Sequence, residues 1–212
     1  MMYDIIKRCI DVIGSVSIGI FFLPICLLVA LAIALDSDGP IFADTPERVG
    51  KSGKLFKLFK FRSMVINAHE KLRSDPKLKK LYSEYKRNSY KLREDPRVTL
   101  VGRFIRKHSL DEIPQLLNVL RGEMSLVGPR PYYPDELVEQ QHKYPHTKTL
   151  VKIVLSEKPG ITGHWQVSGR SEVNFDKRIK MDADYVKRKS LILDLFILLK
   201  SPFAMISGKG AV

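Results

Sequence analysis

One uncharged stretch constrains this chain more than any other feature, because residues 12–35 contain no charged side chain: VIGSVSIGIFFLPICLLVALAIAL. A helix of about 20 apolar residues crosses the ~30 Å hydrocarbon core of a bilayer. Hydropathy alone therefore favours a single transmembrane anchor. The stretch is too long for a removable signal peptide and lacks a small-residue cleavage site.

Pro24 and the flanking charges favour a different path through the membrane. Proline removes a helix hydrogen bond and kinks the run near its middle, leaving halves of about 18 Å that are each too short to cross alone. Lys7 and Arg8 favour a cytoplasmic N-terminus, so a straight span would export the remaining Lys- and Arg-rich residues against the positive-inside rule. We therefore expect residues 1–36 to form a re-entrant helix that returns to the cytoplasmic face, with residues 37–212 as the attached domain.

The rest of the chain predicts a small α/β domain dominated by helix. Residues 41–64 alternate loosely between apolar and basic side chains around a GKSGK turn, which indicates one or two strands. Residues 65–95 are polar and helix-prone, with a break at Asp75-Pro76. Residues 95–110 have an amphipathic pattern that fits a helix at the membrane interface and fits core packing nearly as well. Residues 190–206 are apolar but too short and too charged to span, so we expect them at the interface or against the membrane helix.

The formal net charge of +13 points to an anionic partner: nucleic acid, anionic lipid or a phosphorylated substrate. Both cysteines, Cys9 and Cys26, belong to the N-terminal apolar region, which leaves none for a metal cluster or a disulfide framework. Aromatic residues do not interleave with the basic clusters, and no nucleic-acid-binding signature appears. These two observations weigh against a nucleic-acid partner.

An acidic pair in this basic chain is the first candidate for chemistry. Ser109, Asp111 and Glu112 have the spacing of a helix capping box, in which Ser109 and Glu112 satisfy free backbone donors. The same residues suit catalysis, because a carboxylate such as Asp111 can attack phosphorus and divide one difficult step into two. Arg106 stands five residues upstream and could neutralise substrate charge. Structural and chemical interpretations both remain open from these residues alone.

Two further arginines lie in loops suited to phosphate. Arg130 lies between Pro129 and Pro131, which hold the backbone extended and project the guanidinium. Arg170 ends the glycine-punctuated loop EKPGITGHWQVSGR, whose glycines would let the backbone approach a ligand. Surface arginines are more often solvated than catalytic, so this interpretation depends on their meeting the acidic pair.

Five segments, in this order, carry a family resemblance: KRCIDVIGS, PERVGKSGKLFKLFKFRSM, DPRVTLVGRFIRKHSLDEIPQLLNVLRGEMSLVGPRP, KPGITGHWQVSGRS and DADYVKRKSLILDL. They cover nearly the whole chain, and the central motif and the glycine loop are the most specific. The chain resembles the bacterial sugar transferases, the monotopic polyprenyl-phosphate phosphoglycosyl transferases. It departs from them at Leu23, where members often have Ser before the kinking proline, and it lacks the N-terminal helix bundle of larger relatives.

This resemblance implies an enzyme at the cytoplasmic face of the bacterial plasma membrane. Asp111 would attack the sugar-side phosphorus of a UDP-sugar, UMP would leave, and undecaprenyl phosphate would take the sugar phosphate from the aspartate. Glu112 would assist with protons or metal, and Mg²⁺ held by Asp111 and Glu112 would offset diphosphate charge. The product would start a surface glycan such as exopolysaccharide or O-antigen. The stretch 65–95 resembles the hexose-transferring members, which favours galactose or glucose.

The resemblance also implies a set of substrate-binding residues, namely Lys60, Arg62, Arg106, Pro129, Arg130 and Arg170. Membrane lipids are the other expected partners, and the interfacial C-terminal segment is compatible with a homodimer. Two alternatives stay open. One is a membrane-anchored basic protein that binds nucleic acid or scaffolds partners, and the other is a single-step transferase in which Asp111 only holds the metal.

Overall fold

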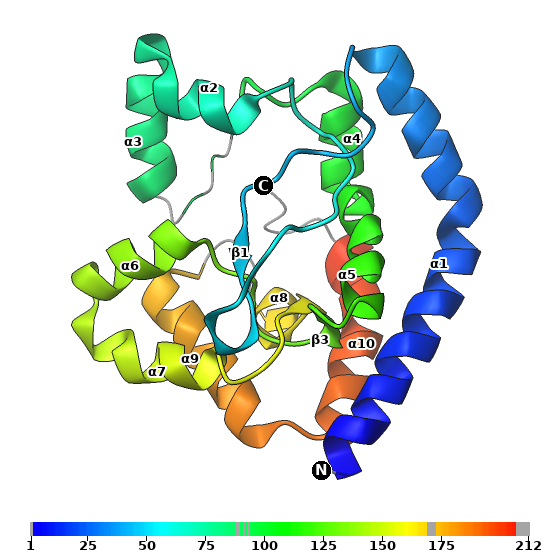
Figure 1. Ribbon diagram of the computed structural model, residues 1–212, viewed down its shortest axis with the longest axis vertical. Coiled ribbons are helices and arrows are strands. Elements are labelled where there is room, and N and C mark those ends of the chain that lie inside the picture. Colours follow the sequence, from blue (N-terminus) through cyan, green and yellow to red (C-terminus); the bar gives the residue numbers. More distant parts are fainter. Residues whose placement is uncertain (1, 88–89, 91, 93, 169–172, 207–212) are drawn as a thin grey trace.

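The computed structural model describes residues 2–87, 90, 92, 94–168 and 173–206. Helices dominate this part of the chain, as the sequence predicts (Figure 1). The α-helices are α1 (Met2–Asp36), α2 (Ala68–Ser74), α3 (Lys79–Arg87), α4 (Leu100–Lys107), α5 (Leu116–Leu120), α6 (Pro134–Lys143), α7 (Lys148–Val154), α8 (His164–Ser168), α9 (Phe175–Arg188) and α10 (Leu191–Ile206). The strands are β1 (Arg48–Val49), β2 (Leu55–Phe56), β3 (Ser125–Val127) and β4 (Gly160–Thr162), and the 3-10 turns are η1 (Lys51–Gly53), η2 (Pro76–Leu78), η3 (Leu110–Gln115) and η4 (Pro145–Thr147).

The first half of α1 is fastened to the rest of the fold by polar contacts. Its Arg8 guanidinium donates to the carbonyl of Val119 at 2.6 Å and to that of Leu120 at 2.9 Å, so it caps the end of α5. Its Asp11 carboxylate is buried and accepts from the Ser125 hydroxyl and the Leu126 amide, each at 3.0 Å. These charge-assisted bonds fix the helix against α5 and β3.

The second half of α1 is fastened by apolar packing. Val29 and Ile33 form a buried cluster with Phe61 and Ile105, the latter from α4. Pro24 lies between the two attachments, in a helix that continues to Asp36 and bows along one side of the molecule (Figure 1). The helix thus contacts the rest of the chain at both of its ends.

The outward face of α1 is apolar and exposed. Within the described residues, α1 is the only helix whose length and composition suit a membrane crossing. Large apolar side chains are also exposed on α4, where they are Leu100 and Phe104, and on α10, where they include Ile192, Leu199 and Phe203. Each of these helices also has a buried apolar side chain, Ile105 in α4 and Ile197 in α10, which packs against the rest of the fold.

The described residues form two short sheets, and the second of them ties together segments that are distant in sequence. The predicted strands around GKSGK are β1 and β2, which pair antiparallel across η1. β3 and β4 pair parallel, with Ser125 opposite Gly160 and Val127 opposite Thr162. The backbones at Gly160 and Gly128 approach each other closely. A Cβ on Gly160 would lie 2.0 Å from the Gly128 nitrogen, so only glycine fits there.

The capping box predicted at Ser109 and Glu112 is wrong. Ser109 has a φ of 54°, in the left-handed region, and its side chain makes no capping hydrogen bond. The tight exit from α4 requires this conformation, since the Ser109 amide donates to the Arg106 carbonyl at 3.0 Å. The chain then continues as η3, with Asp111 and Glu112 in its first turn. The helix break predicted at Asp75-Pro76 is confirmed, because α2 ends at Ser74 and η2 begins at Pro76.

Candidate functional site

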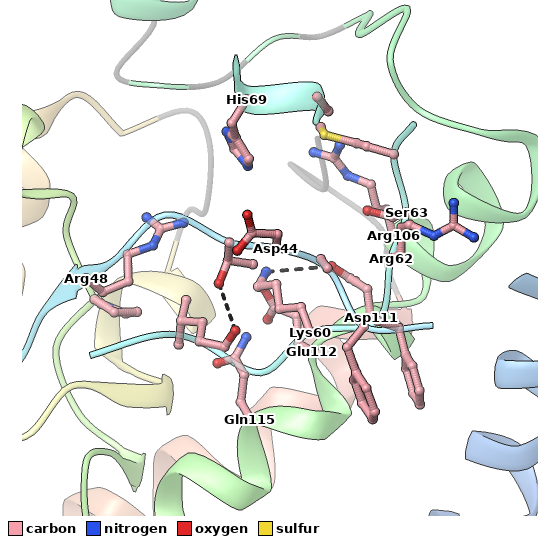
Figure 2. A pocket seen from close by; sticks show the side chains of 18 of the residues that line it. Asp44, Arg48, Lys60, Arg62, Ser63, His69, Arg106, Asp111, Glu112 and Gln115 are labelled. Carbon is pink, nitrogen blue, oxygen red and sulfur yellow. Dashed lines mark hydrogen bonds and ion pairs between the residues drawn. The ribbon is translucent and has the colours of Figure 1, made fainter. Parts of the chain in front are cut away.

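A cavity of about 380 Å³ lies between the acidic pair and the segments that surround it. Its walls come from the strand region around β1 and β2, from α2, from η3 and from the loop that holds Arg130. Figure 2 shows Asp111, Lys60 and Glu112 together at its floor, with Arg48 and His69 on other walls. Residues far apart in the sequence therefore face one space.

Backbone contacts place Lys60 opposite the acidic pair. Asn118 of α5 is fully buried, and its amide donates to the Lys57 carbonyl at 2.8 Å and accepts from the Phe59 amide at 2.9 Å. The amide of Phe61 donates to the Asp111 carbonyl at 3.0 Å. Lys60 lies between these two anchors, so its side chain has to point toward η3.

The three charged groups form a compact cluster. Lys60 Nζ lies 2.6 Å from Glu112 Oε1 and 3.6 Å from Asp111 Oδ2. The Asp111 side chain is 10% exposed and that of Glu112 is 39% exposed. Asp111 is therefore largely desolvated, whereas Glu112 reaches the open part of the cavity.

Burial raises the pKa of the Asp111 carboxyl above its ordinary value; Lys60 and Arg106 oppose the shift, while Glu112 adds to it. Burial alone would lower the pKa of Lys60, but Glu112 and Asp111 outweigh it and raise that pKa. The neighbouring cations thus favour the ionised carboxylate, as expected, but desolvation has the larger effect. A carboxylate that is poorly solvated and held beside a cation is suited to nucleophilic attack.

Arg130 lines the same cavity, and α9 holds its loop in place. The buried Asp182 carboxylate accepts from the Arg130 amide at 3.1 Å and from the Tyr132 hydroxyl at 2.8 Å. The Pro129 carbonyl accepts from the Gly160 amide at 2.8 Å, so Pro129 secures the loop to β4 and does not line the cavity. Arg106 of α4 also lines the cavity, near the acidic pair (Figure 2).

Among the predicted substrate-binding residues, Arg62 also has structural hydrogen bonds. Arg62 lines the cavity, but its guanidinium donates to the carbonyls of Asp38 at 2.5 Å and Ser37 at 2.7 Å. Those bonds secure the chain just after α1, and this gives Arg62 a structural task whatever else it contacts. Arg170 lies outside the described residues.

Sequence reasoning assigned no role to Arg48, Tyr133 and His69, which line the cavity. Arg48 lies over the Tyr133 ring, with the guanidinium carbon 3.2 Å from the ring centroid. His69 of α2 points into the cavity (Figure 2), and burial followed by the charges of Arg97 and Arg48 lowers its pKa to about 4. Arg48 stands in one of the quoted motifs, but nothing in the sequence distinguishes it from the other basic residues there.

The carboxylates present are compatible with a magnesium ion that substrate helps to hold. Among the described residues no group of three or more His, Cys, Asp or Glu could hold a metal alone. Mg²⁺ in phosphoryl-transfer sites commonly binds one or two carboxylates together with substrate phosphates. Glu112, the more exposed of the pair, meets that requirement with Asp111 beside it.

Comparison with known proteins identifies the family of the chain. The chain matches the family model described as bacterial sugar transferase over residues 2–208. It is 43% identical over 210 residues to an undecaprenyl-phosphate galactose phosphotransferase of Salmonella typhimurium, covering 97% of this chain and 41% of that protein. It is 35% identical over 213 residues to the UDP-glucose:undecaprenyl-phosphate glucose-1-phosphate transferase of Escherichia coli, covering 98% of this chain and 41% of that protein.

A shorter relative is matched over most of its length. The exopolysaccharide production protein ExoY of Sinorhizobium fredii is 40% identical over 205 residues, covering 97% of this chain and 87% of that protein. The chain spans about two fifths of the length of the larger relatives. On the family match and these similarities, the chain belongs to the bacterial sugar transferase family.

Proposed function

We propose that this chain transfers a hexose 1-phosphate from UDP-galactose or UDP-glucose to undecaprenyl phosphate and releases UMP. The observation that carries the proposal is the desolvated Asp111 carboxylate, 3.6 Å from Lys60, at the floor of a cavity lined by Arg106 and Arg130. Relatives named for galactose and for glucose transfer support the choice of hexose. The product would begin a surface glycan.

The chemistry divides into two displacements at phosphorus. In the first, an Asp111 oxygen bonds to the sugar-side phosphorus, the bond from that phosphorus to the bridging oxygen breaks, and UMP leaves with that oxygen. In the second, an oxygen of undecaprenyl phosphate attacks the same phosphorus and the bond to Asp111 breaks. The carboxylate is regenerated, and the lipid carries a diphospho-sugar.

The cations of the cavity serve both displacements. Lys60, Arg106 and Arg130 would stabilise the negative charge that develops on the phosphoryl oxygens, as fixed charges in a water-poor site do. Glu112 fixes the Lys60 ammonium at 2.6 Å and is the more accessible carboxylate for proton handling. Mg²⁺, held by Asp111 and Glu112 with the substrate phosphates, would supply further neutralisation of the diphosphate.

The membrane arrangement belongs to the same proposal. We place α1 in the cytoplasmic leaflet as a re-entrant helix bent at Pro24, with the exposed apolar faces of α4 and α10 at the interface. The contacts at both ends of α1 support this, because a straight crossing would carry α4, α5 and β3 into the hydrocarbon with the helix. Lipid substrate would then reach the cavity from the α1 side. The division at residue 36 and the homodimer stay predictions.

Family membership favours group transfer over the alternative of a nucleic-acid-binding or scaffold protein. The one-step alternative, in which Asp111 only holds the metal, differs in what happens without lipid. A covalent route releases UMP up to one equivalent per enzyme when undecaprenyl phosphate is absent, while a one-step route releases none.

The test is UMP release from the full chain in nanodiscs with Mg²⁺, undecaprenyl phosphate and a panel of UDP-sugars. We expect turnover with UDP-galactose or UDP-glucose and none with Asp111→Asn. Omitting the lipid should leave a single burst of UMP, with labelled sugar phosphate retained on the protein. A folded, membrane-bound protein that released no UMP from any donor would contradict the proposed activity.

A further inference from the structure

Arg48 is a buried cation that no described group neutralises. The residue is 8% exposed and lines the cavity. Within the described part of the chain, no carboxylate forms a salt bridge with it and no acceptor takes a hydrogen bond from its side chain, and its Nε is buried without a partner. Its guanidinium stacks on the face of the Tyr133 ring.

The backbone around Arg48 holds it in this position. The Val49 amide donates to the Tyr132 carbonyl at 2.9 Å, so β1 runs beside the loop that carries Arg130. Stacking on Tyr133 fixes the plane of the guanidinium while leaving its edge, with the hydrogen-bond donors, free to face the cavity. Arg48 and Arg130 thus reach the same space from adjacent segments.

A buried charge without a partner is unfavourable, and such arginines persist where a ligand completes them. The donor geometry of a guanidinium matches phosphate oxygens, which it can bind in a bidentate manner. In this cavity Lys60 already has Glu112 and Asp111 as partners. Arg48, unlike Lys60, would therefore gain a charged partner that it does not have among the described residues when a phosphate arrives.

The position of Arg48 selects which phosphate it meets. In Figure 2, Arg48 lies on one side of Asp111 and α1 on the other, and Figure 1 likewise places α4 and α5 between β1 and α1. Asp111 attacks the reacting phosphorus opposite the departing UMP, and the lipid phosphate later attacks opposite Asp111, so UMP and the lipid phosphate use the same face of that phosphorus. They differ in the direction in which they extend, because the polyprenyl chain would run toward α1 and the nucleotide would lie toward Arg48.

We infer that Arg48, stacked on Tyr133, binds the uridine-side phosphate of the UDP-sugar and of the product UMP. This inference rests on the proposed function and assigns one of its binding contacts. It makes Arg48 a nucleotide-binding residue that leaves lipid recognition to the α1 side of the site.

The test compares Arg48→Met and Arg48→Lys with the full chain and with a matched control, Arg121→Met. Arg121 is an exposed arginine that also stacks on an aromatic ring, with its guanidinium carbon 4.5 Å from the centroid of Phe59, but it lies outside the cavity. UMP affinity is measured by calorimetry in detergent, and KM for UDP-hexose and for undecaprenyl phosphate by UMP release. Thermal unfolding without ligand reports whether each variant is folded.

For Arg48→Met we expect about a tenfold or larger loss of UMP affinity and a similar rise in KM for UDP-hexose, with KM for the lipid unchanged. Arg48→Lys should lie between it and the wild type, and Arg121→Met should match the wild type. Binding of UMP needs no turnover, so this measurement tests the role of Arg48 separately from the proposed transferase activity. If the wild type bound UMP but released none from any donor, the transferase activity would be contradicted, while the inference that Arg48 binds the nucleotide phosphate would stand.

Equal UMP binding by wild type and by both Arg48 variants would overturn the inference. So would a rise in KM for the lipid alone, since the phosphate bound by Arg48 would then be that of undecaprenyl phosphate. If Arg48→Met fails to fold, Arg48→Lys decides, because it keeps the charge and loses the bidentate geometry. A wild-type chain that did not bind UMP would refute both the inference and the proposed activity.

Discussion

The pair Arg178–Glu136 and the cluster of Lys60 with Glu112 and Asp111 both join a cation to carboxylates, but their surroundings differ. Arg178 and Glu136 pair at 2.8 Å with side chains only 1% and 0% exposed, and aromatic rings of Tyr132 and Trp165 lie beside the guanidinium. Lys60 pairs with Glu112 and Asp111 at the wall of a cavity that a ligand can enter. A closed pair can only hold the fold together, whereas an open one can change partners when a phosphate arrives.

The difference teaches that burial alone does not identify a functional charge. Glu136 is more buried than Asp111, but it does not line the cavity, and both of its carboxylate oxygens accept hydrogen bonds, from Arg178 and from the Tyr133 amide. Asp111 is desolvated on the protein side and accessible on the cavity side. Perturbation of these two pairs should therefore separate loss of stability from loss of chemistry.

The largest effect is expected from Asp111→Asn, which removes the nucleophile and keeps the shape. UMP release should fall by about a thousandfold or more. Since burial raises the pKa of Asp111 above its unfolded value, ionised Asp111 opposes folding at neutral pH, and that opposition disappears as pH falls below the folded-state pKa. Tm at neutral pH should accordingly not decrease, and a large decrease would show that Asp111 is mainly structural.

Glu136→Gln should have the opposite profile. Breaking a buried pair leaves Arg178 uncompensated and costs about 3–5 kcal/mol of unfolding free energy. Denaturant unfolding in detergent should show this loss, and activity should fall only in proportion to the unfolded fraction. Reduced kcat in protein that remains fully folded would instead connect Glu136 to the reaction.

Lys60→Met should change the pH dependence of the reaction. Lys60 lowers the pKa of Asp111 against the effect of burial, so removing it should raise that pKa further and reduce the ionised fraction at a given pH. The acid limb of the kcat/KM profile should move to higher pH, and the plateau should fall by ~100-fold as one stabilising cation is lost. Lys60→Arg serves as the control that keeps the charge. An unmoved acid limb in Lys60→Met would mean that the limb reports another group.

The smallest effect is expected at the surface. Arg73 and Asp135 pair at 3.1 Å with side chains 52% and 36% exposed, and screening by water leaves such pairs within about 0.5 kcal/mol of neutral. Asp135→Asn, one residue before Glu136, should change neither Tm nor UMP release. A strong loss of stability would mean that position 135 contributes through α6 itself and would weaken its use as the control for Glu136→Gln.

Parts of the site were predictable from sequence because they depend on local order. Asp111 and Glu112 attract attention as an acidic pair in a chain of net charge +13, and Pro129 and Pro131 mark Arg130 as a fixed loop residue. Lys60, Arg106 and Arg130 do meet the pair at one cavity. The prediction of a capping box was wrong because a 3-10 turn can have the same residue spacing, and local spacing cannot distinguish the two.

By itself the sequence determined the long apolar N-terminal helix, the dominance of helix and the family, since hydropathy, periodicity and ordered motifs are properties of the chain read in order. Only the tertiary structure decided that Arg48 is buried over Tyr133, that Arg62 secures the segment after α1, and that Lys60 pairs with both acids of the acidic pair. Each of these depends on contacts between segments distant in sequence, such as the bridge from Val49 to Tyr132. Desolvation and pairing are set by such contacts, and they decide which charges can act on a ligand.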